Sequence, residues 1–385
     1  MRIAYITSSS FVDTDFPLIR QLVKNGHEIA LFIKLHPSGL RSTLFDIPEQ
    51  YPHPGVYESS VYGGVIDFYK DYLGLKTIYV INHLKDGVTW SDFKLLKQEI
   101  SLIRKFNPDV IQHVAWPFFT DIPLSFVFRK KFVITIHDPL PHELNSHAKK
   151  MRILRLATNW VNSHYILLND TQTEGFMSYY HVSNKKIHFA SIGNVEVMRL
   201  FGKEIKDAPK TILFYGRISK YKGVEYLLKS FELIKSKYPD VKLIIAGSGK
   251  FHFDISPYKD DRQIEFINRF ITLEEMGSLI KNCLFAVCPY ISATQSGVVA
   301  SIHALNKPVI VTNVGGLPKM VEDRKTGIII PPCDEVVLSQ SMDELLSNPS
   351  IIQDMVKNIR QSAEEGKNSW KEIAYKYENV YELID

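Results

Sequence analysis

The chain of 385 residues is long enough for two domains of ordinary size, each with its own hydrophobic core. Hydrophobic residues make up 45% of the sequence and charged residues 23%, as in soluble globular proteins. A net charge of only +4 excludes the strongly basic surface of a general nucleic-acid-binding protein. Cys283, Cys288 and Cys333 have no metal-binding spacing, which predicts free thiols in a reducing compartment.

The chain starts with MRIAYITSS, which predicts a strand and contains no secretory signal. No apolar run in the sequence approaches the roughly 20 residues of a membrane-spanning helix. We therefore expect a cytoplasmic protein, which could also lie against the inner face of a membrane.

Short apolar runs alternate with longer helical segments along the first half of the chain. The first strand, Arg2–Ser8, is followed by a helix with an apolar stripe, a stop at Asn25-Gly26 and a second strand. Further strands are predicted at Asp109–Ala115, Lys131–Asp138 and His164–Asp170. Because helices separate them, we predict parallel strands with crossover helices, which is the doubly wound architecture.

The same alternation restarts after the polar segment Gly202–Lys210, which contains a proline and is predicted to be a linker. Strands follow at Thr211–Arg217, Val241–Gly249, Leu284–Tyr290, Lys307–Asn313 and Gly327–Pro332. We therefore predict an α/β fold of two doubly wound, Rossmann-like domains whose facing strand ends enclose a ligand-binding cleft. The last segment has a helical apolar stripe that could pack on either domain.

Two cations follow the first strand of the second domain. In FYGRISKYKG, Arg217 comes after Gly216 at the carboxyl end of the strand, and Lys222 opens the next helix. Charge-assisted hydrogen bonds from these side chains, together with helix N–H groups, suit a diphosphate. The alternative is solvated surface charge. Gly249, in the turn IIAGSGK, would allow a close backbone approach to a ligand, although such turns are common.

The segment SATQSGVVASIHAL starts with small polar residues and is predicted to be helical from Val298 on. Thr294 or Ser296 is a candidate N-cap. The N–H groups of Gly297, Val298 and Val299 would then present the positive end of the helix dipole to a ligand. A capped helix with a purely structural role is the alternative. No acidic residue occurs in this segment, so any binding would depend on its backbone and small side chains.

In the first domain, His137 and Asp138 follow a predicted buried strand at its carboxyl end, where both structural and functional histidines occur. The first strand-to-helix loop, TSSSFVDTDFP, includes Ser9 and Ser10 and could line the cleft opposite the phosphate site. No spacing of histidines and carboxylates suggests a metal site. For the acidic part of the loop, the alternative role is capping of the following helix by Asp13, Thr14 or Asp15.

The segments FRKKF and HAKKMRILRLATNW predict a mixed basic and apolar surface. Their cations are Arg129, Lys130, Lys131, Lys149, Lys150, Arg152 and Arg155. Since Ile153 and Leu156 fall on the basic side of the predicted helix, this surface could rest on an anionic bilayer. A solvated helix is the alternative.

The segments FYGRISKYKGVEYLLKSF, KLIIAGSGK and NKPVIVTNVGGLPKMVEDRKTGIIIPP together resemble the C-terminal domain of retaining glycosyltransferases of family four, which have the GT-B fold. In the first half, NGHEIALF, NPDVIQHV and FVITIHDPLPH fit the same family. The resemblance implies that residues 1–200 form the acceptor-side domain and residues 201–367 the donor-binding domain. It also implies that the helix at 368–385 packs back on the first domain.

The resemblance further implies roles for single residues. Arg217 and Lys222 would bind the donor diphosphate and stabilise the leaving group, and His137 would lie near the transferred sugar. These three would form the catalytic set, with no metal or other cofactor. Residues 294–297 would border the sugar, and Arg269 and Phe270 the base. The full set of substrate-binding residues would be Ser9, Ser10, Asp138, Gly216, Gly249, Arg269, Phe270, Thr294, Gln295, Ser296, Gly297, Val298, Val299 and Ser301.

The sequence departs from the family's pattern at two places. The family's two glutamates fall on Thr294 and on Ser301 or Ile302, depending on the alignment, and Lys319 stands where an acid is usual. The second glutamate normally grips the ribose, which leaves Ser301 and His303 as the nearby candidates for that role. TQSG is similar to a loop variant found in part of the family.

We therefore expect a retaining, metal-independent hexosyltransferase. Its donor would be a nucleotide-sugar, UDP-linked in our interpretation, and its acceptor a glycan or lipid-linked glycan of polysaccharide biosynthesis. One alternative is a GT-B sugar-nucleotide epimerase, which would need carboxylates that the segment 290–319 lacks. Another is a non-catalytic nucleotide-sugar-binding partner of an active transferase, which the missing glutamates would suit.

Overall fold

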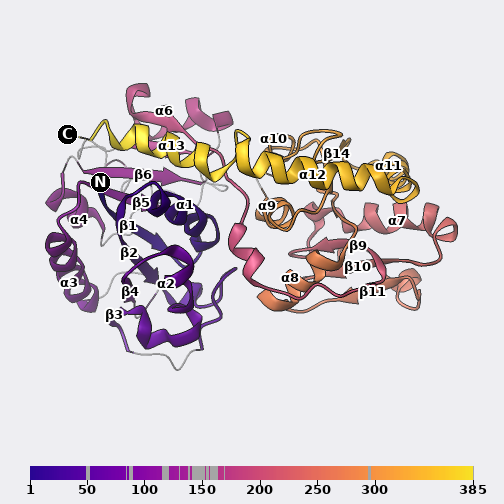
Figure 1. Ribbon diagram of the computed structural model, residues 1–385, viewed down its shortest axis with the longest axis horizontal. Helices are drawn as coiled ribbons and strands as arrows, with labels where there is room; N and C mark the ends of the chain where they lie inside the picture. The colour runs from indigo at the N-terminus through magenta and orange to yellow at the C-terminus, as the bar shows by residue number, and fades with distance from the viewer. Residues whose placement is uncertain are drawn as a thin grey trace. The chain divides into compact units, whose positions relative to one another are not determined.

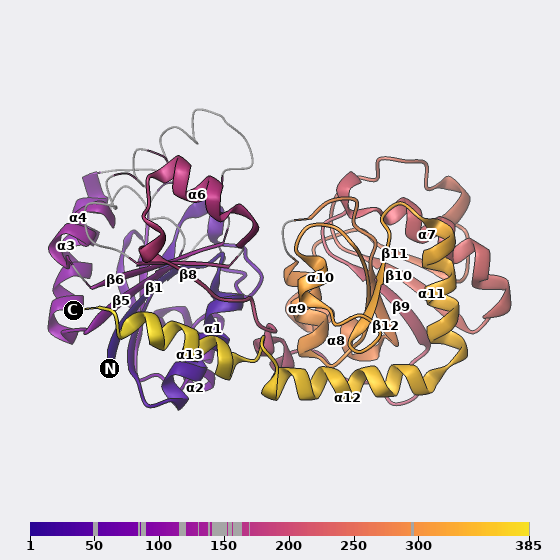
Figure 2. The same cartoon turned by 90° about the horizontal axis from the view of Figure 1, so that it is seen from above.

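The computed structural model describes residues 1–48, 53–83, 85, 90–114, 121–129, 131–137, 139–140, 152, 156, 164–168, 170–293 and 296–384. The chain divides into two compact units, residues 1–192 together with 370–385, and residues 193–369. Each unit is a sheet of mainly parallel strands between layers of helices (Figures 1 and 2). The predicted α/β fold with two doubly wound sheets is confirmed.

As far as the chain is described, the first unit is built on an eight-stranded sheet. Its strands lie in the order β3-β4-β2-β1-β5-β6-β7-β8, and β3 is antiparallel to β4 while the other neighbours are parallel. The strand order reverses between β1 and β5, and ligands of such sheets bind at this switch point. The strands are β1 (Arg2–Ser8), β2 (Glu28–Leu35), β3 (Gly55–Glu58), β4 (Ile78–Asn82), β5 (Val110–Val114), β6 (Phe132–Ile136), β7 (His164–Leu167) and β8 (Ile187–Phe189).

Helices cover both faces of this first sheet (Figure 2). One face carries α1 (Val12–Lys24), α2 (Phe68–Leu73) and α13 (Trp370–Tyr381). The other carries α3 (Trp90–Phe106), α4 (Asp121–Val127) and α6 (Thr173–Tyr180), whose apolar side chains meet those of the strands in one buried cluster. α13 comes from the far end of the sequence and lies beside α1 (Figure 1).

A buried row of hydroxyl and amide groups attaches α13 to the first sheet. The hydroxyl of Tyr377 lies 3.0 Å from Oγ1 of Thr135, and the hydroxyl of Tyr381 donates to Oε1 of Gln112 at 3.1 Å. Nε2 of Gln112 in turn donates to Oγ1 of Thr135 at 2.9 Å. Burial of such groups costs free energy unless they are hydrogen-bonded, so this network holds the helix in one position on the sheet.

The second unit is built on a parallel sheet with the strand order β11-β10-β9-β12-β13-β14 and a switch point between β9 and β12. Helices α8 and α9 lie on one side of it and α7 and α11 on the other (Figure 2). The strands are β9 (Lys210–Tyr215), β10 (Val241–Ala246), β11 (Ile264–Ile267), β12 (Phe285–Cys288), β13 (Val309–Thr312) and β14 (Gly327–Ile330). The helices are α7 (Val224–Ile234), α8 (Leu273–Asn282), α9 (Gly297–Ala304), α10 (Leu317–Met320), α11 (Glu335–Ser347) and α12 (Pro349–Glu365).

The segment before β9 packs on the second unit. A 3₁₀ helix at Glu196–Leu200 lies against α9, and its Val197 and Met198 are fully buried. The N–H of Val195 also donates to the carbonyl of Ala300 at 3.2 Å. Because of these contacts the units divide before Gly193, earlier in the chain than the expected division after residue 200. None of the helices in the described ranges is long and apolar enough to cross a bilayer.

Candidate functional site

The loop after β9 brings the two predicted phosphate-binding cations to the switch point of the second sheet. Gly216, with a φ of 127°, turns the chain towards Arg217. A 3₁₀ turn at Lys220–Lys222 then leads into Gly223, whose φ is 66°, and into α7. A Cβ atom at Gly223 would lie 1.9 Å from the carbonyl oxygen of Pro289, so only glycine allows this approach. The loops after β9 and β12 are therefore in direct contact.

Lys222 is buried in this loop, and none of the described residues supplies it with a counter-charge. Its Nζ lies 3.7 Å from the centroid of the Tyr290 ring and 5.2 Å from that of Tyr221. Burial lowers the pKa of Lys222 to about 8; Cys288 opposes this shift and Arg217 adds to it. Burial also raises the pKa of Cys288 to about 11, so its thiol is neutral near pH 7. Within the described ranges, no carboxylate lies within ion-pair distance of Lys222 or Arg217.

The N-terminus of α9 borders the same loop. Oγ of Ser296 accepts from the N–H of Val299 at 3.5 Å, which makes Ser296 the N-cap. A Cβ atom at Gly216 would lie 3.3 Å from Cγ2 of Val298, so the loop after β9 and the first turn of α9 are neighbours. Gly297 is exposed and has open space beside its Cα. The cations and the positive end of the helix dipole thus lie at one place, which suits an anionic ligand.

Both nearby candidates for binding a ribose, Ser301 and His303, are buried in this structure. Ser301 is buried, and its Oγ donates to the carbonyl of Gly297 at 2.8 Å within its own helix. His303 is also buried, and burial lowers its pKa to about 4. The predicted site residues Asp138, Thr294 and Gln295 lie outside the described residues.

The loops after β10 and β11 pair with each other beside the loop after β9. Gly249 has a φ of 151°, and a Cβ atom there would lie 2.0 Å from the carbonyl oxygen of Ile218. The side chain of Asn268 accepts from the N–H of Gly249 and donates to its carbonyl, both at 3.2 Å. This double contact fixes the two loops at the carboxyl edge of the sheet.

Arg269 and Phe270 follow β11 at the same edge. The guanidinium of Arg269 donates to both carboxylate oxygens of Glu275, at 2.9 and 2.6 Å. Glu275 also takes part in the capping box of α8 with Thr272. The charge of Arg269 is therefore already paired, whereas the side chain of Phe270 is half exposed. A base bound here would meet an apolar ring and backbone groups.

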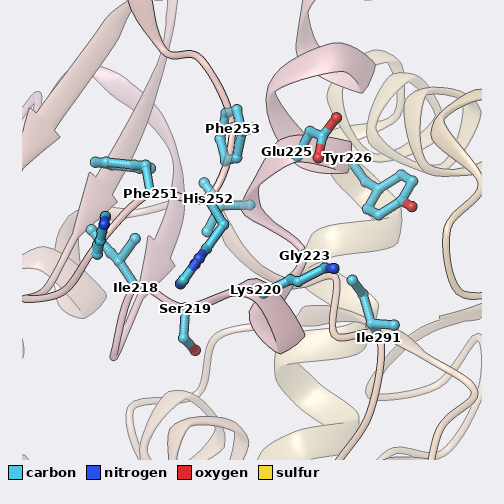
Figure 3. Close-up of a pocket in the computed structure, with 12 residues that line it drawn as sticks. Ile218, Ser219, Lys220, Gly223, Glu225, Tyr226, Phe251, His252, Phe253 and Ile291 are labelled. Carbon is cyan, nitrogen blue, oxygen red and sulfur yellow. The ribbon is translucent and has the colours of Figure 1, made fainter.

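A small pocket of about 80 Å³ opens beside the cationic loop. Figure 3 shows Ser219 and Lys220 from that loop, Tyr226 from the first turn of α7, and His252 from the loop after β10. Oγ of Ser219 is buried without a hydrogen-bond partner in the described part of the chain. Because the pocket shares Ser219 and Gly223 with the loop that carries Lys222, it adjoins this loop on the side of α7.

In the first unit, His137 and the loop after β1 meet at the carboxyl edge of the sheet. The ring centroids of His137 and Phe11 are 4.4 Å apart. Burial lowers the pKa of His137 to about 4, and its Nε2 has no hydrogen-bond partner among the described residues. Ser9 donates from Oγ to the carbonyl of Gly39 at 2.7 Å, whereas Ser10 is exposed. His137 therefore presents a neutral imidazole at pH 7.

The acidic residues of this loop do not cap the helix that follows. α1 begins after Phe11 without a side-chain cap. Asp15 is buried and accepts hydrogen bonds from Tyr5 at 3.0 Å and from Thr7 at 2.5 Å. Burial raises its pKa to about 7 despite these hydrogen bonds. The capping alternative is therefore wrong, because Phe11 occupies the N-cap position. Asp13 accepts from the N–H of Thr14 at 3.0 Å within the first turn, and the carboxylate of Asp15 faces the interior of the unit.

A buried charged cluster lies at the same edge of the first sheet. The ammonium of Lys34 contacts the carboxylates of Asp121 and Glu99, and His113 Nε2 lies 3.1 Å from Asp121 Oδ2. Burial alone would raise the pKa of Asp121, but Lys34 and the hydrogen bond to His113 hold it well below its usual range. Burial raises the pKa of Glu99 instead. The cluster thus balances its own charge, unlike the pair at Arg217 and Lys222.

The predicted basic surface lies largely outside the described residues. Nζ of Lys131 donates to the carbonyl of Pro108 at 2.6 Å. Arg152 donates from Nε to the carbonyl of Tyr179 at 3.3 Å and lies over its ring. These two cations therefore have intramolecular partners. Outside the described residues are Lys130, Lys149, Lys150 and Arg155.

Sequence reasoning missed Tyr290, which contacts Lys222 and reaches the N-cap of α9. The tyrosine stands at the end of a predicted strand, where an aromatic residue is ordinarily part of the core. Tyr290 lies near Lys222 because β9 and β12 are neighbours in the sheet, although about 70 residues separate the two strands in the sequence. A prediction of the strand order would have supplied the signal.

Comparison with known proteins relates the sequence to glycosyltransferases. Residues 199–362 match the family model described as Glycosyl transferases group 1. The matched residues lie within the second unit, residues 193–369. A glycosyltransferase of Methanocaldococcus jannaschii, MJ1607, is 23% identical over 395 residues, covering 95% of this chain and 92% of the relative. Alpha-D-kanosaminyltransferase of Streptomyces kanamyceticus is 27% identical over 150 residues, covering 38% of this chain and 39% of the relative.

Several solved structures resemble the whole chain in fold. A glycosyltransferase from Rickettsia africae has a TM-score of 0.65 at 16% identity and covers 100% of this chain and 98% of its own. Anabaena HepE, solved with UDP-glucose, has a TM-score of 0.63 at 13% identity, and the match covers 100% of this chain and 99% of HepE. Sucrose-phosphate synthase from Thermosynechococcus elongatus has a TM-score of 0.62 at 17% identity, and the match covers 100% of this chain and 98% of the synthase. The expected GT-B fold is confirmed.

Proposed function

We propose that this protein is a retaining, metal-independent hexosyltransferase that transfers a sugar from a UDP-sugar to a glycan or lipid-linked glycan. The observation that carries the proposal is the pair Arg217 and Lys222 beside the N-terminus of α9. Both cations lack a carboxylate partner in the described part of the chain, and they lie where doubly wound sheets bind ligands. The group 1 domain and the fold shared with HepE, which was solved with UDP-glucose, support a nucleotide-sugar as donor.

In the proposed reaction, an acceptor hydroxyl attacks the anomeric carbon on the face from which the diphosphate leaves. The bond between the anomeric carbon and the phosphate oxygen breaks, and that oxygen takes the proton of the acceptor hydroxyl. Arg217, Lys222 and the N–H groups of Val298 and Val299 stabilise the negative charge that develops on the diphosphate. These groups take the place that a metal ion has in other transferases.

The other residues of the proposal bind substrate. Gly249, Arg269 and Phe270 border the nucleoside, since all three are exposed at the carboxyl edge of the sheet and the half-exposed ring of Phe270 can pack against a base. Residues 294–297 border the sugar through small side chains and backbone groups. In the first unit, a neutral His137 is suited to hydrogen bonding with a sugar hydroxyl, because neutral imidazole carries one donor and one acceptor nitrogen.

The experiment is to follow release of nucleoside diphosphate from a panel of nucleotide-sugars, with and without glycan acceptors and with a metal chelator. We expect turnover with a UDP-sugar that survives chelation. Arg217→Ala and Lys222→Ala should each lower the rate by about 100-fold, the usual cost of losing one group that stabilises transition-state charge. Lys220→Ala is the matched control, since Lys220 is exposed in the same turn and should keep the wild-type rate.

Wild-type rates in both Arg217→Ala and Lys222→Ala would show that the site is wrong. The product also separates the alternative functions. Formation of an epimeric UDP-sugar without acceptor would indicate an epimerase. Tight donor binding without turnover on any acceptor would indicate a non-catalytic partner, which the acid-free segment between β12 and α10 would allow.

A further inference from the structure

Tyr290 lies between the cation of the anion site and the helix that completes it. We propose that Tyr290 is a positioning residue, whose ring holds the Lys222 ammonium at the site and whose hydroxyl links it to the N-cap of α9. The inference rests on the proposed function of this site as the place where the donor diphosphate binds.

The ring of Tyr290 is the nearer of two aromatic rings beside the Lys222 ammonium in the described part of the chain. It is fully buried, and its centroid lies 3.7 Å from Nζ, within the range of a strong cation–π contact. Tyr221 is a second aromatic neighbour, but its centroid is 5.2 Å away and its side chain is exposed. The other groups that face Lys222 are Arg217, which repels it, and the neutral thiol of Cys288.

The position of the Tyr290 ring allows it to influence the protonation state of Lys222. Burial beside Arg217 favours the neutral form of Lys222, and no carboxylate within the described ranges opposes that tendency. The negative face of an aromatic ring favours the charged form, and the contact strengthens as water is excluded. Tyr290 therefore keeps Lys222 protonated and fixes the position of the ammonium without neutralising its charge. An anionic ligand can then use that charge in full.

The hydroxyl of Tyr290 reaches the beginning of α9. It lies 3.3 Å from Oγ of Ser296, the atom that also accepts from the N–H of Val299. Burial raises the pKa of this hydroxyl well above its usual range, so it remains a hydrogen-bond donor. The backbone is held as well, since Oγ1 of Thr312 donates to the carbonyl of Tyr290 at 2.6 Å. One rigid residue thus spans the distance from the cation to the helix cap.

The experiment compares UDP binding by calorimetry in the full-length wild type and in Tyr290→Leu, Tyr290→Phe and Tyr221→Leu, between pH 7 and pH 10. Tyr290→Leu keeps the site buried but removes the ring, so UDP affinity should fall at least tenfold, or about 1.4 kcal/mol. Its loss of affinity at alkaline pH should also begin at a lower pH than in the wild type. Tyr290→Phe retains the ring and should keep the wild-type pH profile, with only a small loss of affinity.

Tyr221→Leu is the matched control because it removes the distant, exposed ring. It should keep both the affinity and the pH profile of the wild type. A direct measurement complements the binding data: the pKa of Lys222, followed by NMR of its ¹³Cε, should fall in Tyr290→Leu and stay unchanged in Tyr290→Phe. A merely structural role for Tyr290 would lower thermal stability without moving this pKa.

The outcomes separate this inference from the proposed function. If wild-type protein binds UDP but Tyr290→Leu has the same affinity, pH profile and Lys222 pKa, the inference is wrong and the proposed function stands. If the wild type binds no UDP, the proposed donor is wrong, and the NMR titration still tests whether Tyr290 holds Lys222 in its charged form. If Tyr290→Leu does not fold, Tyr290→Met takes its place, since it also fills the space without an aromatic face.

Discussion

In the second unit, Arg217 and Lys222 carry positive charges that have no carboxylate partner among the described residues. Lys34, a buried cation in the described part of the first unit, contacts Asp121 and Glu99. Lys222 differs, because its closest groups are an aromatic ring, a neutral thiol and a second cation. A buried cation without a counter-charge lowers the stability of the free protein, and such costs are typical of functional sites.

This cost leads to a prediction about stability. The pKa of Lys222 is lowered to about 8 in the folded protein, below its value near 10.4 in an unfolded chain. Between these pH values the unfolded state binds more protons, so the contribution of Lys222 to stability improves as pH rises through this window. Lys222→Met should therefore raise the free energy of unfolding at pH 7 by up to about 3 kcal/mol while abolishing donor binding.

Urea denaturation at pH 7 and pH 9 measures this effect. The stability gain of Lys222→Met over the wild type should be larger at pH 7 than at pH 9. Lys220→Met is the control and should change little, since Lys220 is exposed. A loss of stability at pH 7 in Lys222→Met would mean that the ammonium is well solvated or paired.

Among the secondary-structure elements, helix α9 packs in the core of the second unit and has its N-terminus at the proposed binding site. Its sequence allowed either Thr294 or Ser296 as N-cap, and the structure selects Ser296. The helix is buried along Val299–Ala304, while Gly297 remains exposed at its start. The core thus holds the helix in place, and the cap determines where its first N–H groups point.

Replacement of the N-cap residue Ser296 should affect both the stability of α9 and the binding of UDP. Ser296→Ala should lower the free energy of unfolding by about 1 kcal/mol, the usual cost of losing a serine N-cap. It should also weaken UDP binding, because the first turn of α9 would fray and the N–H groups would lose their orientation. Thermal unfolding and calorimetry measure the two effects, with Ser292→Ala in the exposed part of the preceding loop as control. Unchanged UDP affinity in Ser296→Ala would remove α9 from the binding site.

The elements also show how far the sequence predicts the fold. Buried strands such as β1, β6 and β10 have apolar runs that predict them: the bounds of β1 agree with the prediction, and those of β6 and β10 agree within three residues. β3, β8 and β11 lie at sheet edges, where only one side of the strand is paired, and their runs GVYE, IHF and IEFI are too short to stand out. Arg217 and Lys222 were predictable because they follow one strand directly. Tyr290 was not, because its contact depends on which strands are neighbours.

At the scale of the whole molecule, the last helix belongs to the unit that begins the chain. Trp370 starts α13 after the second unit is complete, and Tyr377 and Tyr381 then join the polar network on the first sheet. The first and last segments of the chain therefore fold together. Residues 193–369 form a continuous unit between them.

This arrangement predicts that hydroxyls of α13 stabilise the first unit. Tyr381→Phe would leave Oε1 of Gln112 buried without its donor, which should cost about 1–3 kcal/mol in the free energy of unfolding. Tyr375→Phe is the matched control on the same helix, because Tyr375 is exposed and should change little. Hydrogen exchange in the full-length protein locates the effect: protection should fall in β5 and β6 and stay unchanged in β9 and β12. A uniform change in both units would contradict the assignment of α13 to the first.

The central claim is that Lys222 binds the diphosphate of a nucleotide-sugar in the second unit. Isothermal calorimetry of UDP with the wild type, Lys222→Ala and Lys220→Ala at pH 7 tests it most directly. The account predicts one UDP per chain, a loss of at least about tenfold in affinity for Lys222→Ala, since charge-assisted phosphate contacts are the strong ones, and no change for Lys220→Ala. Equal affinity of the wild type and Lys222→Ala for UDP would contradict it.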